Sequence, residues 1–256
     1  MILREARLMV VAVQFLTRLP TPPLARFEPE WITASARYFP LVGQIVGGLS
    51  AGVLVVSCHL WTPGIAALLA VAVGVIMTGG FHEDGLADTA DGLGGGLTRA
   101  RRLEIMKDSR LGSYGALALG LTLALKVAAL AMLAASSPAM AAVALLAAHG
   151  LGRAAAVGAM ALMPYGGDPG MAKEGRPDRA APLSVLIASA LALWPLLWLS
   201  PEASATGLIG GLIAAVVPAW LAWRLIGGRT GDVLGAVEQA FELGFLLGVA
   251  AIMGAA

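Results

Sequence analysis

The sequence predicts an all-α fold: a polytopic integral membrane helical bundle with about seven transmembrane helices and a short N-terminal interfacial or re-entrant helix. Of the 256 residues, 58% are hydrophobic and only 13% are charged, and the mean hydropathy is +0.82. This composition is too apolar for a soluble domain of the same length. Apolar runs of roughly 20 residues, long enough to cross a bilayer, recur along the chain. We therefore expect one membrane domain covering residues 1–256.

Prolines lie near the ends of the predicted spans, where the missing N–H group of proline costs least. Residues 5–19 are too few to span, and we expect them to lie in the interface or to re-enter the membrane. The predicted spans are residues 40–60, 63–81, 112–135, 139–163, 182–200, 203–225 and 233–256.

Lysine and arginine are concentrated in alternate connections of the predicted bundle. They precede the first span and follow the second, the fourth and the sixth spans. The connection between the fourth and the fifth span carries Lys173, Arg176 and Arg179. Because basic residues of short loops stay in the cytoplasm, we expect the N-terminus there and the C-terminus outside. The formal net charge of +1 gives no indication of a nucleic-acid partner.

The most polar part of the chain is residues 79–96, GGFHEDGLADTADGLGGG. Asp84, Asp88 and Asp91 are spaced i, i+4, i+7, so a helix would place them on one face. Like charges on one face repel unless a cation lies between them, and Mg²⁺ suits carboxylate and phosphate oxygens. We therefore expect a metal–diphosphate site, with His82 as a base or a phosphate ligand. The alternatives are helix caps, solvated surface carboxylates and, for the histidine, a local hydrogen bond.

A basic segment, RARRLEIMKDSRLGSYG over residues 99–115, follows the acidic one. Its first three arginines fit a positive-inside anchor that contacts anionic lipid. Lys107 and Arg110 instead flank Asp108 just before a glycine-containing turn, where they could neutralise phosphate charge beside the metal.

A second glycine-rich turn, GGRTGDVLG over residues 227–235, precedes the last predicted span. Asp232 could be the N-cap of that helix, or the turn could present N–H groups to an anion. The turn shares with residues 79–87, GGFHEDGLA, a glycine pair and an aspartate five residues after the first glycine. A duplication would explain this likeness, and so would chance in a glycine-rich chain.

Five ionisable side chains lie away from the ends of the predicted spans, where such groups are costly and are usually paired or functional. His149 and Arg153 share a helix face at i, i+4, as do Glu238 and Glu242, and Lys126 lies in another span. A pair between Arg153 and Glu242 is one arrangement that would satisfy them.

Several motifs spread along the chain together resemble one family. They are QFLTRLP at Gln14–Pro20, FPLVG at Phe39–Gly43, GGFHEDGLADTADG at Gly79–Gly92, EIMKDSRLGSYG at Glu104–Gly115, and TGDVLGA from Thr230, followed by Glu242. This set resembles the cobalamin (vitamin B12) synthases, the adenosylcobinamide-GDP ribazoletransferases of the bacterial inner membrane. The acidic segment is highly specific for that family, and the other motifs are individually weak.

The resemblance implies a Mg²⁺-dependent transfer of the cobinamide phosphate of adenosylcobinamide-GDP to α-ribazole or α-ribazole 5′-phosphate. The products would be adenosylcobalamin or its 5′-phosphate and GMP. Phosphoryl transfer depends mainly on positioning and charge neutralisation, which agrees with the acidic and basic segments. The residues then assigned are His82, Asp84, Asp88 and Asp91 to catalysis; Lys107, Ser109, Arg110 and Thr230 to the substrate; and Asp84, Asp88, Asp91, Asp108 and Asp232 to the metal.

Other partners follow from the predicted topology and from the implied reaction. We expect contact with the lipid bilayer, a cytoplasmic acidic segment within reach of nucleotide substrates, and no nucleic acid. Assembly as a homo-oligomer, or with other enzymes of corrinoid synthesis, stays open.

Two other functions fit parts of the sequence. Residues 88–92, DTADG, also resemble the opening of the CDP-alcohol phosphotransferase signature, but Gly94 and Gly95 replace the Ala-Arg expected next. An ion-coupled transporter would account for the ionisable residues within the spans. Its binding site would however lie near the midplane, whereas the acidic cluster lies at a helix end.

Overall fold

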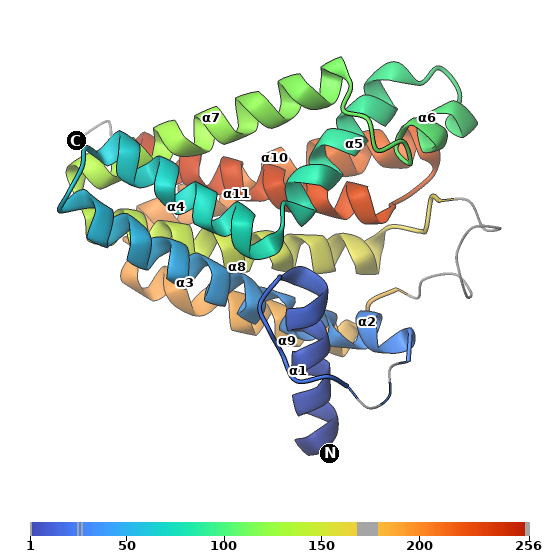
Figure 1. The fold of residues 1–256 in the computed structure, drawn as a ribbon, viewed down its shortest axis with the longest axis horizontal. Helices are drawn as coiled ribbons and strands as arrows, with labels where there is room; N and C mark the ends of the chain where they lie inside the picture. The colour runs from blue at the N-terminus through green and yellow to red at the C-terminus, as the bar shows by residue number, and fades with distance from the viewer. Residues whose placement is uncertain (1, 25, 27, 168–178, 254–256) are drawn as a thin grey trace.

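A bundle of α-helices forms the chain in the computed structural model, which describes residues 2–24, 26, 28–167 and 179–253 (Figure 1). These residues contain no β-strand, which confirms the predicted all-α class. Lys173 and Arg176 of the predicted basic loop lie outside the described residues. The elements are α1 (Ile2–Leu16), α2 (Glu30–Ser35), the 3-10 turn η1 (Ala36–Tyr38), α3 (Phe39–Cys58), α4 (Pro63–Thr78), α5 (Phe81–Gly95), α6 (Arg99–Ile105), α7 (Ser113–Ser136), α8 (Pro138–Leu162), α9 (Pro182–Leu193), the 3-10 turn η2 (Trp194–Trp198), α10 (Pro201–Ile226) and α11 (Gly231–Met253).

Helices α8 and α11 form the centre of the bundle. In Figure 1 the long helices run beside one another along the longest axis, whereas α1 crosses them. Helix α11 contacts α5, α7, α8 and α10, and α8 also packs on α3 and α9. Most of α8 and α11 is buried, whereas most of α7 and α10 is exposed. The apolar surface of α7 and α10 is therefore available to lipid.

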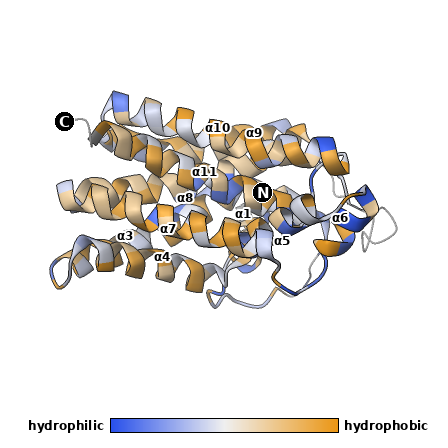
Figure 2. Cartoon of the chain, turned by 90° about the horizontal axis from the view of Figure 1, so that it is seen from above, coloured by the Kyte–Doolittle hydropathy of each residue, from blue (hydrophilic) through white to orange (hydrophobic). Residues whose placement is uncertain are grey.

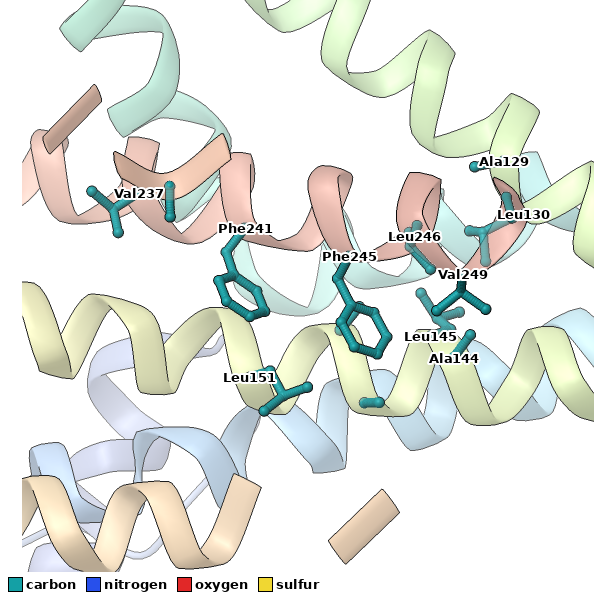
Figure 3. Close-up of a cluster of buried hydrophobic side chains, with 14 of the residues drawn as sticks. Ala129, Leu130, Ala144, Leu145, Leu151, Val237, Phe241, Phe245, Leu246 and Val249 are labelled. Atoms are coloured by element: carbon teal, nitrogen blue, oxygen red, sulfur yellow. The ribbon is translucent and has the colours of Figure 1, made fainter. Parts of the chain in front are cut away.

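The apolar core lies along α11. Phe241 and Phe245 project from α11 toward α8, where Leu151 lies (Figure 3). Helix α10 also approaches these rings closely through glycine: a Cβ added at Gly211 would lie 2.8 Å from the Phe241 ring. This agrees with the role of small residues in membrane bundles, where close backbone approach supplies the packing energy.

Among the described residues, five helices are long and apolar enough to cross a membrane, namely α7, α8, α10, α11 and α3 together with α2 and η1 before it. The predicted number of seven is not confirmed. Helix α9 has only 12 residues, and α4 has 16 and meets α5 at 89°. At 1.5 Å per residue, α4 is about 24 Å long, shorter than a hydrocarbon core of about 30 Å. Helices α4 and α5 thus form a broken span or a re-entrant pair.

The bend between α4 and α5 lies at Gly79 and Gly80. Their φ angles are 69° and 71°, a left-handed conformation that other residues rarely adopt. A side chain at Gly79 would also collide with Arg18, whose Nε lies 2.5 Å from the added Cβ. For these reasons the helix expected over residues 63–81 ends at Thr78.

Hydrophilic residues gather at one end of the bundle, around α5 and α6 (Figure 2). The acidic and basic segments therefore lie at the same end, although they belong to different helices. Helix α6 had no counterpart among the predicted helices because its seven residues are too few to show a periodic pattern.

Candidate functional site

Helix α5 forms the acidic face that the spacing of its carboxylates predicts. Along this face Asp84 is exposed, Asp88 is partly buried and Asp91 is buried. Helix α5 turns away from α4, and hydrophilic residues gather around it at one end of the bundle (Figure 2). The acidic face is therefore at the polar end of the bundle.

Two glycines allow α5 to cross close to the start of α11. A Cβ added at Gly85 would lie 2.9 Å from the backbone oxygen of Asp232, and one added at Gly235 would lie 3.1 Å from that of His82. A larger side chain at either position would push the helices apart. The crossing brings Asp232 to the acidic face, and it joins the two glycine-pair segments whose likeness the sequence shows.

The carboxylates at this crossing repel one another. Burial, followed by the negative charges of Asp84, Asp232 and Asp91, raises the pKa of Asp88 from 3.8 to about 6. A cation between these oxygens would remove the repulsion, and oxygen-only donors suit Mg²⁺. Asp84, Asp88 and Asp232 are therefore the candidate ligands of a divalent cation, although among the described residues only His149, Glu238 and Glu242 place three donor atoms within 4.8 Å of one another.

Asp91 holds the beginning of α7. Its Oδ2 accepts a hydrogen bond from the backbone N–H of Gly112 at 2.7 Å, and its Oδ1 accepts one from Gly115 at 2.9 Å. Both carboxylate oxygens of Asp91 thus accept hydrogen bonds at the N-terminus of α7, where negative charge is favourable. A metal-ligand role for Asp91 stays a prediction, and the structure adds a positioning role that the sequence analysis missed.

The basic loop is tied to α5 through this cap, because Gly112 follows Arg110 by two residues. Within the loop, Arg110 donates to Asp108 at 2.6 Å, and this pairing lowers the pKa of Asp108 to about 2. The charges that act on Asp108 are those of Arg110 and Arg101, not those of the acidic face. Lys107, Ser109 and Arg110 are exposed.

Thr230 caps α11. Its hydroxyl accepts a hydrogen bond from the N–H of Val233 at 3.3 Å and donates one to Asp232 Oδ2 at 3.2 Å. The N-cap is therefore Thr230, two residues before Asp232, which leaves the Asp232 carboxylate in the first helical turn beside α5.

The arginines expected to be a simple anchor also bind the end of α10. Arg99 donates to the carbonyl oxygens of Ile226 and Gly166, each at 2.9 Å, and Arg102 donates to that of Leu225 at 3.3 Å. Cations at a helix C-terminus satisfy its last carbonyl groups. Arg101 instead pairs with exposed Glu104.

The buried ionisable residues form one ion-pair network. Arg153 pairs with both Glu238 and Glu242, which confirms the predicted Arg153–Glu242 pair, and Lys126 donates to Glu242 at 2.5 Å. His149 Nδ1 lies 2.8 Å from Glu242. Although His149, Glu238 and Glu242 are close enough to share a metal ion, the two basic side chains already neutralise the carboxylates. We interpret this network as structural.

His82 lies beneath the acidic face and is 4% exposed. Its Nδ1 is buried and has no hydrogen-bond partner among the described residues. A buried polar atom without a partner is uncommon in native structures and calls for an explanation.

This chain is similar to known proteins of one family. The family model for cobalamin-5-phosphate synthase matches residues 8–250. Relatives named adenosylcobinamide-GDP ribazoletransferase come from Leptothrix cholodnii (44% identical, covering 96% of each chain), Shewanella piezotolerans (42%, covering 94% of this chain and 93% of the relative) and Azorhizobium caulinodans (43%, covering 96% and 97%). No solved structure matches.

Proposed function

Because the chain belongs to the cobalamin-5-phosphate synthase family, we propose that it transfers the cobinamide phosphate of adenosylcobinamide-GDP to α-ribazole or α-ribazole 5′-phosphate. The products are adenosylcobalamin or its 5′-phosphate and GMP. Family membership favours this reaction over the CDP-alcohol phosphotransferase and over the ion-coupled transporter. The chain acts as a multi-pass protein of the bacterial inner membrane, with its acidic face in the cytoplasm.

The convergence of Asp84, Asp88 and Asp232 at the α5–α11 crossing carries this proposal. These carboxylates would hold Mg²⁺, which when bound neutralises charge on the diphosphate. Aspartate oxygens alone would repel a diphosphate, so a cation is needed for the substrate to approach them.

The reaction exchanges one phosphorus–oxygen bond for another. The ribose 3′-hydroxyl oxygen of α-ribazole attacks the phosphorus on the corrinoid side of the diphosphate. The bond from that phosphorus to the bridging oxygen breaks, and this oxygen leaves with GMP. A carboxylate of the acidic face, or His82, accepts the hydroxyl proton.

Basic side chains hold the diphosphate in this proposal. Lys107 and Arg110 are exposed on the loop that Asp91 ties to α5, so they are available to a phosphate. Ser109 lies between them in the sequence and offers a hydroxyl, and Thr230, whose hydroxyl already bonds to Asp232, lies at the start of α11 and offers its N–H group. Asp108 keeps the Arg110 guanidinium in place.

Product identity tests the proposal. Membranes that contain the chain, incubated with adenosylcobinamide-GDP, α-ribazole and Mg²⁺, should release GMP and form adenosylcobalamin, and should do neither without α-ribazole. Substrate accumulation inside vesicles without product would support a transporter instead. Release of CMP with a lipid product from CDP-alcohol would support the other enzyme.

A further inference from the structure

A cavity of about 190 Å³ lies on the inner side of the acidic helix, bounded by α1, α2, α3, α5, α8 and α11. It lies where α1 crosses the bundle. The wall includes Phe15, Phe39, Phe81, His82, Tyr165 and Arg229.

Aromatic rings line one side of this cavity in a continuous chain. Phe15 stacks on Phe39 with a centroid distance of 5.8 Å and meets Phe81 edge to face at 5.2 Å. Phe81 in turn meets the His82 ring edge to face at 5.2 Å. Such rings pair favourably with a further aromatic ring, either stacked or edge to face.

The polar groups of the cavity restrict the ligand further. Buried Arg229 lines it beside Arg153, which already pairs with Glu238 and Glu242, and no carboxylate is among the described residues that line it, which disfavours a cation. His82 Nδ1 needs a hydrogen-bond partner, and a ring nitrogen or a hydroxyl could supply one. The chemistry therefore fits a planar, uncharged or anionic aromatic group that contains nitrogen.

The volume limits how much of a ligand enters. Sites for drug-sized ligands measure about 300–1,000 Å³. A cavity of about 190 Å³ takes one ring system but not a whole nucleotide.

The cavity is next to the carboxylates. His82 precedes Asp84 by two residues on α5, and Gly231 and Gly235, on either side of Asp232, also line the cavity. A ring system in the cavity would therefore leave a sugar attached to it close to the acidic face.

We propose that this cavity binds the aromatic base of the acceptor nucleoside and that His82 positions the base by a hydrogen bond. The identity of the nucleoside rests on the proposed function, in which α-ribazole carries its ribose on a benzimidazole ring. His82 is then a positioning residue, and the hydroxyl proton goes to a carboxylate of the acidic face.

Two neighbouring alanines of α8 provide a matched test. Ala156 lines this cavity, whereas Ala155 lines a separate apolar groove among α8, α9, α10 and α11. Ala156→Phe should raise the KM for α-ribazole at least tenfold and change the KM for adenosylcobinamide-GDP less than twofold. Ala155→Phe should change neither. Equal KM values for α-ribazole in the two folded variants would overturn the proposal.

Substitutions of His82 separate positioning from catalysis. His82→Gln keeps a hydrogen-bonding side chain and should raise the KM for α-ribazole less than His82→Phe does, with kcat within threefold in both variants. A loss of kcat in both variants at unchanged KM would make His82 the proton acceptor and refute the positioning role.

Binding without turnover keeps this inference separate from the proposed function. In equilibrium dialysis with no nucleotide, detergent-solubilised wild-type protein and Ala155→Phe should retain benzimidazole above empty micelles, and Ala156→Phe should not. If Ala156→Phe does not fold, benzimidazole inhibition of the wild type decides: it should compete with α-ribazole and not with adenosylcobinamide-GDP. If the protein retains benzimidazole but releases no GMP, only the proposed function is refuted. If it releases GMP but neither retains benzimidazole nor shows competition with α-ribazole, only the cavity assignment is refuted.

Discussion

Gln239 on α11 donates a hydrogen bond from Nε2 to Oε1 of Glu83 on α5, over 3.0 Å. Gln239 also accepts a hydrogen bond from Lys126 Nζ at 2.7 Å. The buried ion pairs of the bundle therefore continue to the helix that carries the acidic face. Moving α5 away from α11 would leave buried members of this network without their partners, which is costly. The network therefore holds α5 in one position.

Neutralising a carboxylate at the α5–α11 crossing should abolish turnover. Asp84→Asn and Asp88→Asn each remove an anionic oxygen from the set that fits Mg²⁺, so GMP release should fall at least 100-fold while the protein stays in the membrane. Glu104→Gln, an exposed carboxylate on α6, is the control and should keep activity. Wild-type activity of either aspartate variant at limiting Mg²⁺ would refute the metal assignment.

Stability without metal should depend on pH through Asp88. Its pKa of about 6 in the folded protein exceeds 3.8, so the folded state binds more protons than the unfolded state between these values. Stability in Mg²⁺-free buffer should therefore decrease as pH rises from 4 to 6.5. Thermal unfolding should show this slope reduced in Asp88→Asn, and Mg²⁺ should stabilise the wild type more at pH 7.5 than at pH 5.5. An unchanged slope in the variant would contradict the assignment.

Removing the cap on α7 should lower stability as well as activity. Asp91→Ala leaves the N–H groups of Gly112 and Gly115 without an acceptor, at a cost of about 1–3 kcal/mol in unfolding free energy. Ser137→Ala removes the cap of α8, far from the acidic face, and is the matched control. Both variants should melt earlier in detergent, but only Asp91→Ala should lose GMP release at a temperature where both are folded. Equal activity would show that Asp91 serves the fold alone.

The arginines of α6 should separate into two classes. Arg99→Ala frees carbonyl groups at the end of α10 and should lower the melting temperature, whereas Arg101→Ala breaks only an exposed pair worth about 0–1 kcal/mol. Arg110→Ala should raise the KM for adenosylcobinamide-GDP, and neither of these two variants should. If Arg101→Ala proves as damaging as Arg110→Ala, the basic site extends onto α6.

Breaking the buried network should be costly. Glu242→Gln leaves Lys126 and Arg153 with less negative charge around them, and removing one partner of a buried pair costs about 3–5 kcal/mol. Chemical unfolding in detergent should measure this loss, with Glu104→Gln as the surface comparison. A loss below about 1 kcal/mol would show that water reaches the network.

The sequence predicts what depends on local spacing. Apolar runs located the long helices, and the i, i+4, i+7 spacing identified the acidic face. Of the contacts between distant segments, the Arg153–Glu242 pair could be anticipated because charged groups inside a span need partners, whereas nothing local shows that Asp91 caps α7 or that Gln239 reaches Glu83. The direction of the bend at Gly79 also depends on tertiary packing.

The shortness of α4 links the acidic helix to the thickness of the surrounding bilayer. A helix of 16 residues leaves a hydrophobic mismatch of several ångströms, which lipids relieve by thinning around it or by shifting its depth. Since α5 follows α4 after only Gly79 and Gly80, any such shift moves the carboxylates toward or away from the headgroup layer. Acyl-chain length thereby becomes a physical variable that sets how far the site projects into water.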